Sequence, residues 1–321
     1  MKRILFNCNQ TQQQGLGHFS RCLNLAKHMM LDGSFDITFI GKFSSFAESV
    51  LINERIPFFS VKNDSEILAQ TFKFNYILFD RYDLNQQFID ELAEIDDLKC
   101  IYIDDFNQLD FSKQDLVINF RVGAENFAYE TKNKALGKDY FIFNPSLSYV
   151  RERYEFKSKV KNLLLFGSGT NQSNTTFTDI PRWLLNEFPE LQITHITSKP
   201  VLNSCERYSS IGISSSMEKR FIEADAIING GGLIKYEASY CGIPAATLST
   251  TSEQHLDTLI LEKAGLLFNI GDQSKTSKNT VKIKVIDFIK SKSKREKLHH
   301  SGRTFFSTDS VKNLIIMING L

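Results

Sequence analysis

The chain contains 321 residues, which is more than one hydrophobic core usually supports and suits two domains. Its 38 Lys and Arg residues balance 37 Asp and Glu residues, so the charge gives no indication of nucleic acid or an acidic polymer as partner. The apolar fraction of 42% is typical of ordinary globular proteins.

The first half of the chain alternates short apolar runs with helical patterns, which is typical of β-α-β units around a parallel sheet. Residues 3–8 predict the first strand, residues 15–17 a turn, and residues 18–31 a helix with apolar side chains at helical spacing. Further strands are predicted at 36–40, 58–61, 76–80, 99–104 and 116–119, and further helices at 44–53 and 83–95.

The pattern loosens between residues 137 and 154 and restarts at 162, which predicts a domain boundary between 155 and 156. The expected domains are therefore 1–155 and 156–321, both of the doubly wound, Rossmann-like α/β type. The second domain is predicted to contain strands at 162–166, 192–197, 226–229, 245–248 and 266–269, helices at 179–187, 217–224, 233–241, 254–263 and 278–291, and loops at 198–216 and 271–277.

Hydrophobicity and cysteine usage predict a cytoplasmic protein. The longest apolar runs are far below the roughly 18 residues that a membrane helix needs. The first residues enter a strand pattern without a signal-peptide layout. Five cysteines at irregular spacings indicate neither a disulfide framework nor a zinc site. We therefore expect no membrane insertion.

The first segment with candidate functional residues joins the first strand to the first helix and contains Gly15, Gly17, His18 and Arg21. Ligands of open α/β sheets bind outside the carboxyl ends of the strands, where glycines allow close backbone approach and helix N–H groups attract anions. The positive end of the helix dipole favours a neutral His18, a candidate general base. Arg21 lies one turn on, within reach of a phosphate or carboxylate. The alternative is that the glycines only turn the chain and His18 caps the helix.

The second segment runs from the strand at 226–229 into Gly230, Gly231 and Gly232, followed by a helix that contains Glu237. Consecutive glycines at a helix start expose N–H groups that suit a diphosphate, and an acidic residue one turn on suits ribose hydroxyls. The alternative is that the glycines tighten the packing between strand and helix and that Glu237 is a surface charge.

A weaker candidate is the turn after the first strand of the second domain, which contains Gly167, Gly169 and Thr170. By symmetry with the first domain we expect it to line the same cleft. Gly and Ser are, however, also ordinary turn residues.

Acidic residues end two strands of the first domain. Asp80, followed by Tyr82, and Asp104 are each candidates to orient His18 or to hold sugar hydroxyls. The alternative is that these carboxylates cap the helices that follow. The polar loop at 250–255 either touches a ligand or caps the next helix.

Together these residues resemble the nucleotide-sugar hydrolases of pseudaminic acid biosynthesis. This family removes UDP from a 2,4-diacetamido-2,4,6-trideoxy sugar and belongs to the GT-B glycosyltransferase-like superfamily. The similarity spans most of the chain and is carried by the Gly-x-Gly-His-x-x-Arg pattern at 15–21, the Asp-x-Tyr pattern at 80–82, the segments at 103–105, 115–119 and 149–154, and the series of Gly230, Gly231, Gly232, Glu237, 242–244 and Gln254.

The resemblance implies a GT-B-like fold with two domains facing across a cleft, a sugar side in the first domain and a UDP side in the second. It also implies catalytic roles for His18, Asp80 and Tyr82, with His18 positioning or deprotonating the attacking water. The glycines and Glu237 of the second domain would hold UDP, and no cofactor is implied.

Several residues depart from the pattern of the family. Arg81 replaces a histidine, Asp83 a common glycine, Gly232 a serine, and Glu253 the asparagine before Gln254. The turn at 167–169 also reads Gly-Ser-Gly where the family has Gly-Gly-Ser or Gly-Gly-Thr. We expect the UDP-binding framework to tolerate these changes better than the sugar contacts do.

Two other functions fit the same residues. One is a glycosyltransferase, in which His18 would deprotonate an acceptor hydroxyl, and the other is an inactive sugar-nucleotide binder. The sequence lacks the Asp-x-Asp pattern with which other sugar-nucleotide enzymes hold a divalent ion, which predicts no metal requirement.

Overall fold

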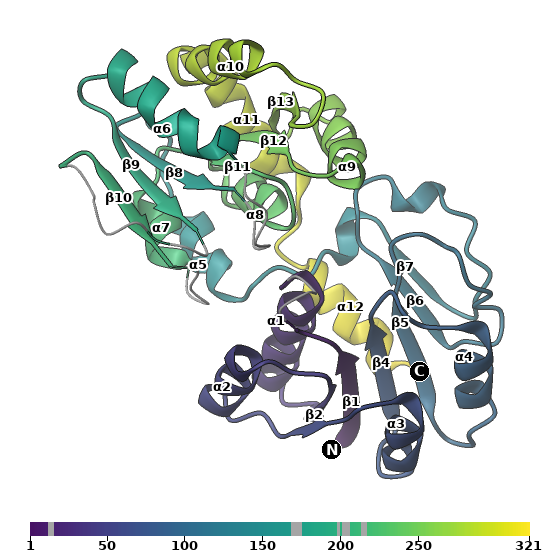
Figure 1. Cartoon of the computed structure of the whole chain (residues 1–321). Coiled ribbons are helices and arrows are strands. Elements are labelled where there is room, and N and C mark those ends of the chain that lie inside the picture. The colour runs from purple at the N-terminus through teal and green to yellow at the C-terminus, as the bar shows by residue number, and fades with distance from the viewer. Residues whose placement is uncertain (12–15, 168–174, 198–199, 201–205, 213–216) are drawn as a thin grey trace. The chain divides into compact units, whose positions relative to one another are not determined.

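A computed structural model describes residues 1–11, 16–167, 175–197, 200, 206–212 and 217–321. The chain divides into two compact units, each with one parallel sheet (Figure 1). Unit 1 comprises Met1–Pro145 and Ser307–Leu321, and unit 2 comprises Ser146–Phe306. The predicted α/β class with two parallel sheets flanked by helices is confirmed.

Unit 1 contains a seven-stranded sheet in the order β3-β2-β1-β4-β5-β6-β7, and all neighbouring strands are parallel. The direction of the strand order reverses between β1 and β4, so the carboxyl ends of these strands form the topological switch point at which α/β sheets bind ligands. The strands are β1 (Lys2–Cys8), β2 (Phe35–Gly41), β3 (Phe58–Ser60), β4 (Tyr76–Asp80), β5 (Lys99–Ile103), β6 (Leu116–Asn119) and β7 (Lys134–Leu136), and the α-helices are α1 (Gly17–Asp32), α2 (Ser45–Asn53), α3 (Asp64–Thr71), α4 (Gln86–Ala93) and α12 (Ser310–Asn319).

The central strand β4 is buried at all five positions. Because alternate side chains of a strand point to opposite faces, both faces of the sheet are covered at this strand. Phe79 of β4 stacks on Tyr102 of the neighbouring strand β5, with ring centroids 5.2 Å apart. The same Phe79 ring meets Phe88 of α4 edge to face at 5.7 Å. This core fixes the positions of the ends of β4 and β5, and so of the polar residues that follow each strand.

Unit 2 contains a six-stranded parallel sheet in the order β10-β9-β8-β11-β12-β13, with its switch point between β8 and β11. Its core packs strand residues such as Leu165 and Ile228 against Phe177 and Phe288 of the flanking helices. The strands are β8 (Asn162–Phe166), β9 (Gln192–Ile196), β10 (Tyr208–Ile211), β11 (Ala226–Asn229), β12 (Ala245–Ser249) and β13 (Phe268–Asp272), and the helices are α5 (Ser146–Arg153), α6 (Thr175–Glu187), α7 (Glu218–Glu223), α8 (Ile234–Cys241), α9 (Ser252–Lys263), α10 (Lys278–Lys290) and α11 (Lys292–Phe305).

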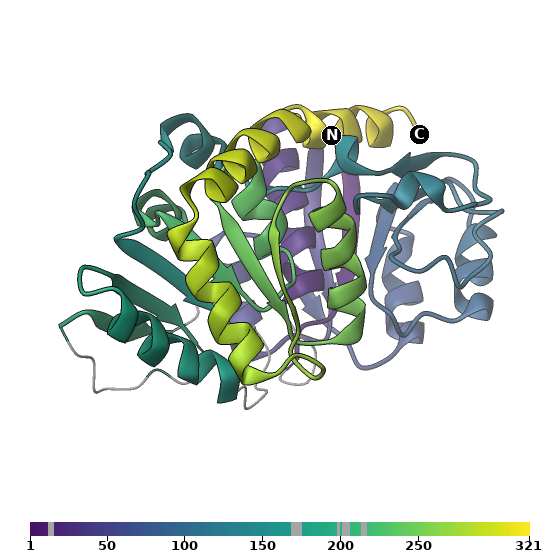
Figure 2. The ribbon, with the colours of Figure 1, turned by 90° about the horizontal axis from the view of Figure 1, so that it is seen from above.

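The last helix, α12, belongs to unit 1, which differs from the expected second domain of 156–321. Its buried face contains Val311, Leu314, Ile315 and Ile318, and the helix contacts α1. Figure 2 shows both chain termini at the same end of unit 1, where the Lys2 ammonium donates to the carbonyl of Asn319 at 2.6 Å. The buried apolar side chains of α12 therefore complete the core of unit 1.

The boundary between the units falls at 145/146, ten positions before the expected one, because α5 packs against α8 of unit 2. The sequence pattern also misses α3, α5, α12, β7 and β10, of which all but the ten-residue α12 have eight residues or fewer. The helix expected at 83–95 begins later, since the Asn85 side chain accepts a hydrogen bond from the N–H of Phe88 and caps α4 at Gln86.

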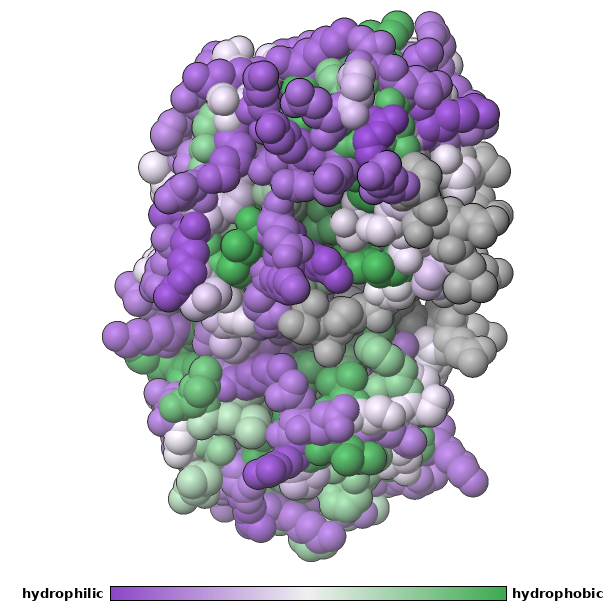
Figure 3. All heavy atoms as spheres, turned by 90° about the vertical axis from the view of Figure 1, so that its left-hand side faces the viewer, coloured by the Kyte–Doolittle hydropathy of each residue, from purple (hydrophilic) through white to green (hydrophobic). Residues whose placement is uncertain are grey.

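Among the described residues, no helix combines the length and apolar character needed to cross a membrane. On the face drawn in Figure 3, hydrophilic side chains predominate and hydrophobic ones form separate patches.

Candidate functional site

A polar cluster lies at the switch point of unit 1. The strand register pairs Cys8, the last residue of β1, with Asp80, the last residue of β4. Asp80 therefore lies at the edge of the sheet where both strands end. Helix α1 follows β1 and brings His18 and Arg21 to this edge. The space beside Gly17 is open, since a Cβ atom added to this glycine would meet no other atom within 4 Å. Gly15 lies outside the described residues.

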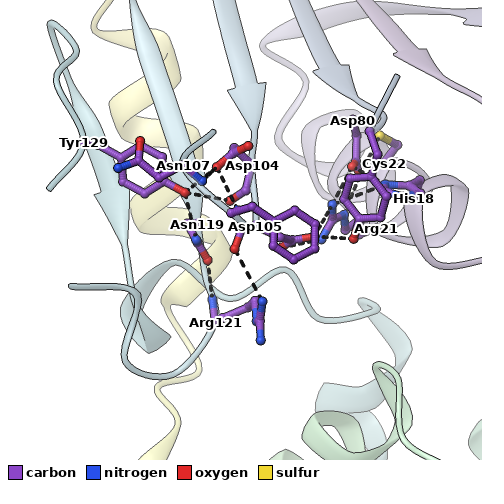
Figure 4. A network of polar contacts seen from close by, with 12 residues as sticks. His18, Arg21, Cys22, Asp80, Asp104, Asp105, Asn107, Asn119, Arg121 and Tyr129 are labelled. Carbon is purple, nitrogen blue, oxygen red and sulfur yellow. Dashed lines mark hydrogen bonds and ion pairs between the residues drawn. The ribbon is translucent and has the colours of Figure 1, made fainter. Parts of the chain in front are cut away.

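His18 and Arg21 both bind Asp80, which is fully buried (Figure 4). The His18 Nδ1 lies 2.6 Å from the Asp80 Oδ1, and the Arg21 Nε and Nη2 donate to the two carboxylate oxygens at 2.5 and 2.6 Å. A carboxylate accepts hydrogen bonds only, so the proton between the two groups belongs to Nδ1, and Nε2 is the ring nitrogen left for another partner. Among the described residues Nε2 has no hydrogen-bond partner, and the His18 side chain is 17% exposed. Of the two proposed supports for His18, Asp80 is the one in contact.

Asp105 is the second carboxylate of the cluster. It accepts hydrogen bonds from Arg21 Nη1 at 3.1 Å and from the Tyr82 hydroxyl at 2.7 Å. Burial would raise the pKa of Asp105, but the Arg21 guanidinium and the hydrogen bonds lower this pKa to about 2. Partial removal from water and the Asp105 carboxylate raise the pKa of Tyr82, so its hydroxyl stays protonated. The edge of one ring faces the other in the His18–Tyr82 pair, with centroids 4.3 Å apart.

Asp104 does not join this cluster, which corrects its assignment as a support for His18. Its Oδ2 accepts from the N–H groups of Phe106 and Asn107 at 3.0 and 2.6 Å and from the Tyr129 hydroxyl at 2.5 Å (Figure 4). Asp104 thus organises the turn after β5, while its neighbour Asp105 enters the cluster. The turn, and not the strand pattern, decides which side chain of this acidic pair points toward Arg21, and a contact of Asp104 with sugar hydroxyls stays a prediction.

Two arginines have different surroundings. Arg81, at a family histidine position, donates to Asp64 of α3 at 2.6 Å and lies over the Phe88 ring. It stabilises the packing of α3 and is not part of the cluster around His18. Arg121, which sequence analysis missed, donates to the backbone carbonyl of Asp105 at 3.4 Å and adds positive charge beside the cluster.

The glycine turn of unit 2 lies at the switch point of the second sheet. The Gly230 N–H donates to the Phe166 carbonyl at 2.9 Å, and the Gly231 N–H donates to the Asn229 side chain at 2.9 Å. Two of the three glycine N–H groups are therefore used inside the protein, contrary to the expectation that the triplet exposes several. Gly232 is exposed, and α8 begins without a side-chain cap, which leaves the first N–H groups of this helix for an anion.

Close packing explains two of the glycines. A Cβ atom on Gly230 would lie 1.5 Å from the Gly167 carbonyl oxygen, and one on Gly231 would lie 2.8 Å from the Gln254 Oε1. Gln254 also accepts from the Thr250 hydroxyl at 2.8 Å and so braces the turn. The packing alternative weighed for the glycine triplet thus holds for Gly230 and Gly231. Gly169 and Thr170 lie outside the described residues.

A buried ion pair supports the same turn. Lys235 is fully buried, and its ammonium lies 2.7 Å from the Asp257 carboxylate of α9. The Tyr236 hydroxyl donates to the other Asp257 oxygen at 2.5 Å. The start of α8 is therefore fastened to α9, although nothing in the sequence pattern distinguished Lys235 from a surface lysine.

We expect Gly230→Ala to lower the free energy of unfolding by about 3 kcal/mol, because the methyl group would overlap the Gly167 backbone. Gly17→Ala is the matched control, since its Cβ meets open space and the change should be neutral or stabilising by up to about 1 kcal/mol. Chemical denaturation measures both values. Equal stabilities of the two variants would contradict the close approach.

Glu237 should make stability depend on pH, because burial raises its pKa to about 7. The folded protein binds this proton more tightly than the unfolded chain, whose glutamates titrate near pH ~4.3. The contribution of this proton to the free energy of unfolding is therefore complete below about pH 4 and is lost as the pH rises to about 7. Glu237→Gln should match the wild type near pH 4.5 and exceed its stability by about 1–3 kcal/mol at pH 8.

The measurement is a denaturation series between pH 4.5 and 8. Glu155→Gln, at an exposed position of the same unit, is the control and should show no such trend. A difference between Glu237→Gln and wild type that does not change with pH would contradict an uncharged Glu237.

The two parallel sheets and their strand orders define a protein of the GT-B fold class. The solved structures that share this fold include the following two. Arabidopsis thaliana UGT89C1 complexed with quercetin has a TM-score of 0.69 at 10% identity and covers 99% of this chain and 98% of its own. The S. aureus MnaA–UDP complex has a TM-score of 0.66 at 13% identity, with 99% and 96% covered.

Among curated proteins, the chain is similar to the spore coat polysaccharide biosynthesis protein SpsG of Bacillus subtilis. The identity is 23% over 246 residues, which cover 72% of each chain. No protein-family model matches the chain.

Proposed function

We propose that this protein is a nucleotide-sugar hydrolase that releases UDP from a UDP-diacetamido-trideoxyhexose in the formation of a pseudaminic-type nonulosonic acid. The observation that carries the proposal is the state of His18. Its Nδ1 is bound to the buried Asp80, and its Nε2, which is the proton acceptor in a neutral imidazole, has no partner among the described residues. The likeness to SpsG and to the MnaA–UDP complex supports sugar-nucleotide chemistry on this fold.

In the proposed reaction, the His18 Nε2 accepts a proton from water while the water oxygen forms a bond to the anomeric carbon. The bond between that carbon and the phosphate oxygen breaks, and UDP leaves with the electron pair. Asp80 keeps the proton on Nδ1 and stabilises the imidazolium that forms. Arg21, which contacts Asp80 and Asp105 together, holds Asp80 in place.

Unit 2 would supply the nucleotide-binding residues. The uncapped start of α8 after Gly232 suits the diphosphate, and its fixed orientation would stabilise the charge that develops on the departing UDP. Glu237, which lies one turn into α8, suits the ribose hydroxyls whether its carboxyl group is protonated or ionised.

A glycosyltransferase is the second candidate. The same Nε2 would then accept the proton of an acceptor hydroxyl, and likeness to UGT89C1 favours this reaction as much as hydrolysis. A protein that binds sugar nucleotides without turnover is the third.

The deciding experiment measures free UDP after incubation with UDP-sugars in the presence and absence of an acceptor. Hydrolysis predicts release without an acceptor. Release only after addition of an acceptor would show transfer, and binding of UDP-sugars without release would show an inactive binder. Either of the last two results would refute the proposal.

A further inference from the structure

An exposed tyrosine contacts His18, and an exposed phenylalanine contacts that tyrosine. Tyr82 follows β4 and is 62% exposed, and Phe106 follows β5 and is 39% exposed. Their ring centroids lie 5.2 Å apart with the ring planes tilted by 54°, and the Tyr82 ring also meets the His18 ring edge to face at 4.3 Å. The pair therefore forms a continuous aromatic surface that starts at the proposed base.

The Tyr82 hydroxyl is bound to Asp105, so the exposed part of this side chain is the apolar ring. A ligand that covers such an exposed ring removes apolar surface from water, which favours binding. Ligand sites typically combine such aromatic surfaces with a few convergent polar groups, and His18, Arg21 and Asp105 provide these groups at the same place.

The turn that carries Phe106 is held firmly. Asp104 accepts from the backbone N–H of Phe106 and of Asn107, and Tyr129 donates to the same oxygen. Asn107 adopts a left-handed backbone with φ 53°, which asparagine tolerates better than most residues. The backbone of Phe106 is therefore fixed before any ligand arrives, which reduces the entropy cost of binding.

We propose that Tyr82 and Phe106 form an aromatic platform for the sugar of the substrate and that Phe106 determines specificity for a hexose with apolar substituents. This inference rests on the proposed function, because it places the sugar beside His18. The methyl group of a 6-deoxy sugar would pack on the Phe106 ring. The hydroxyl group of a hydroxymethyl substituent at the same place would be desolvated without gaining a hydrogen bond.

The experiment compares UDP-N-acetylglucosamine with its 6-deoxy counterpart, both as Kd values from titration calorimetry and as kcat/KM values for UDP release. Wild type should prefer the 6-deoxy sugar by about tenfold, within the range that one methyl group provides in an apolar site. Phe106→Ala should abolish this preference, so that the two sugars give about equal values. The Kd of UDP without a sugar should stay unchanged. Phe106→Leu should retain part of the preference.

Phe72→Ala is the matched control. Phe72 is 74% exposed in the same unit, but it follows α3 and precedes β4, so it lies at the amino edge of the sheet, away from His18. This variant should keep the full preference. Unfolding midpoints of all variants show whether each is folded.

A wild-type protein without preference, or a Phe106→Ala variant that keeps it, would overturn the platform. If a UDP-diacetamido-trideoxyhexose and both test sugars release no UDP, the proposed hydrolysis fails, and the ratio of the two Kd values still decides for or against the platform. The two ideas are therefore tested separately.

Discussion

Replacing His18 by alanine is expected to reduce UDP release by a factor of about 10²–10⁴, which is the usual contribution of a general base. In the described cluster, Asp80 anchors the imidazole ring through Nδ1, and Nε2 has no partner among the described residues. The Kd of UDP should stay within a factor of about two, since the proposed nucleotide-binding residues lie in unit 2. Steady-state release of UDP and calorimetric titration with UDP measure the two effects.

His300→Ala provides the control for this variant. His300 is an exposed histidine of α11 in unit 2, and its loss should change neither quantity. Undiminished UDP release in His18→Ala would remove the proposed base from the mechanism.

Asp80→Asn is expected to lower the free energy of unfolding by about 3–5 kcal/mol, the usual cost of leaving one partner of a buried ion pair behind. Asp80 is completely buried, and Arg21 is bound to both of its oxygens. UDP release should also fall, because an amide at position 80 no longer fixes the His18 proton on Nδ1. Urea denaturation and the release assay test the two parts.

The control is Glu94→Gln, which removes the exposed ion pair with Lys113 at 3.3 Å. Exposed pairs contribute little, so this variant should lie within about 0.5 kcal/mol of wild type. A loss of less than about 1 kcal/mol in Asp80→Asn would show that the cluster is not the tightly coupled unit described above.

The sequence predicted the class of the fold and half of the cluster. Alternating strand and helix patterns indicate parallel α/β sheets because both periods follow from local backbone geometry. The same local geometry places His18 and Arg21, three residues apart, on one face of α1. The glycine turns could also be located, since strand ends followed by consecutive glycines are visible in the sequence.

Other parts depend on residues that are distant in the chain. Arg21 meets Asp80 and Asp105 across 59 and 84 positions, and only the strand order β1-β4-β5 brings them together. The choice between Asp104 and Asp105 depends on the turn after β5, where hydrogen bonds with Tyr129 and Asn107 draw Asp104 away from His18. No spacing rule within the sequence expresses such contacts.

By itself, therefore, the sequence determined most of the longer strands and helices, the places of the glycine turns, and that His18 begins a helix after the first strand. The tertiary structure alone decided which carboxylates meet that helix, that Gly230 and Gly231 are required by packing, and that α12 completes unit 1. The physical reason is that secondary structure arises from neighbours in sequence, whereas burial, ion pairing and steric exclusion depend on neighbours in space.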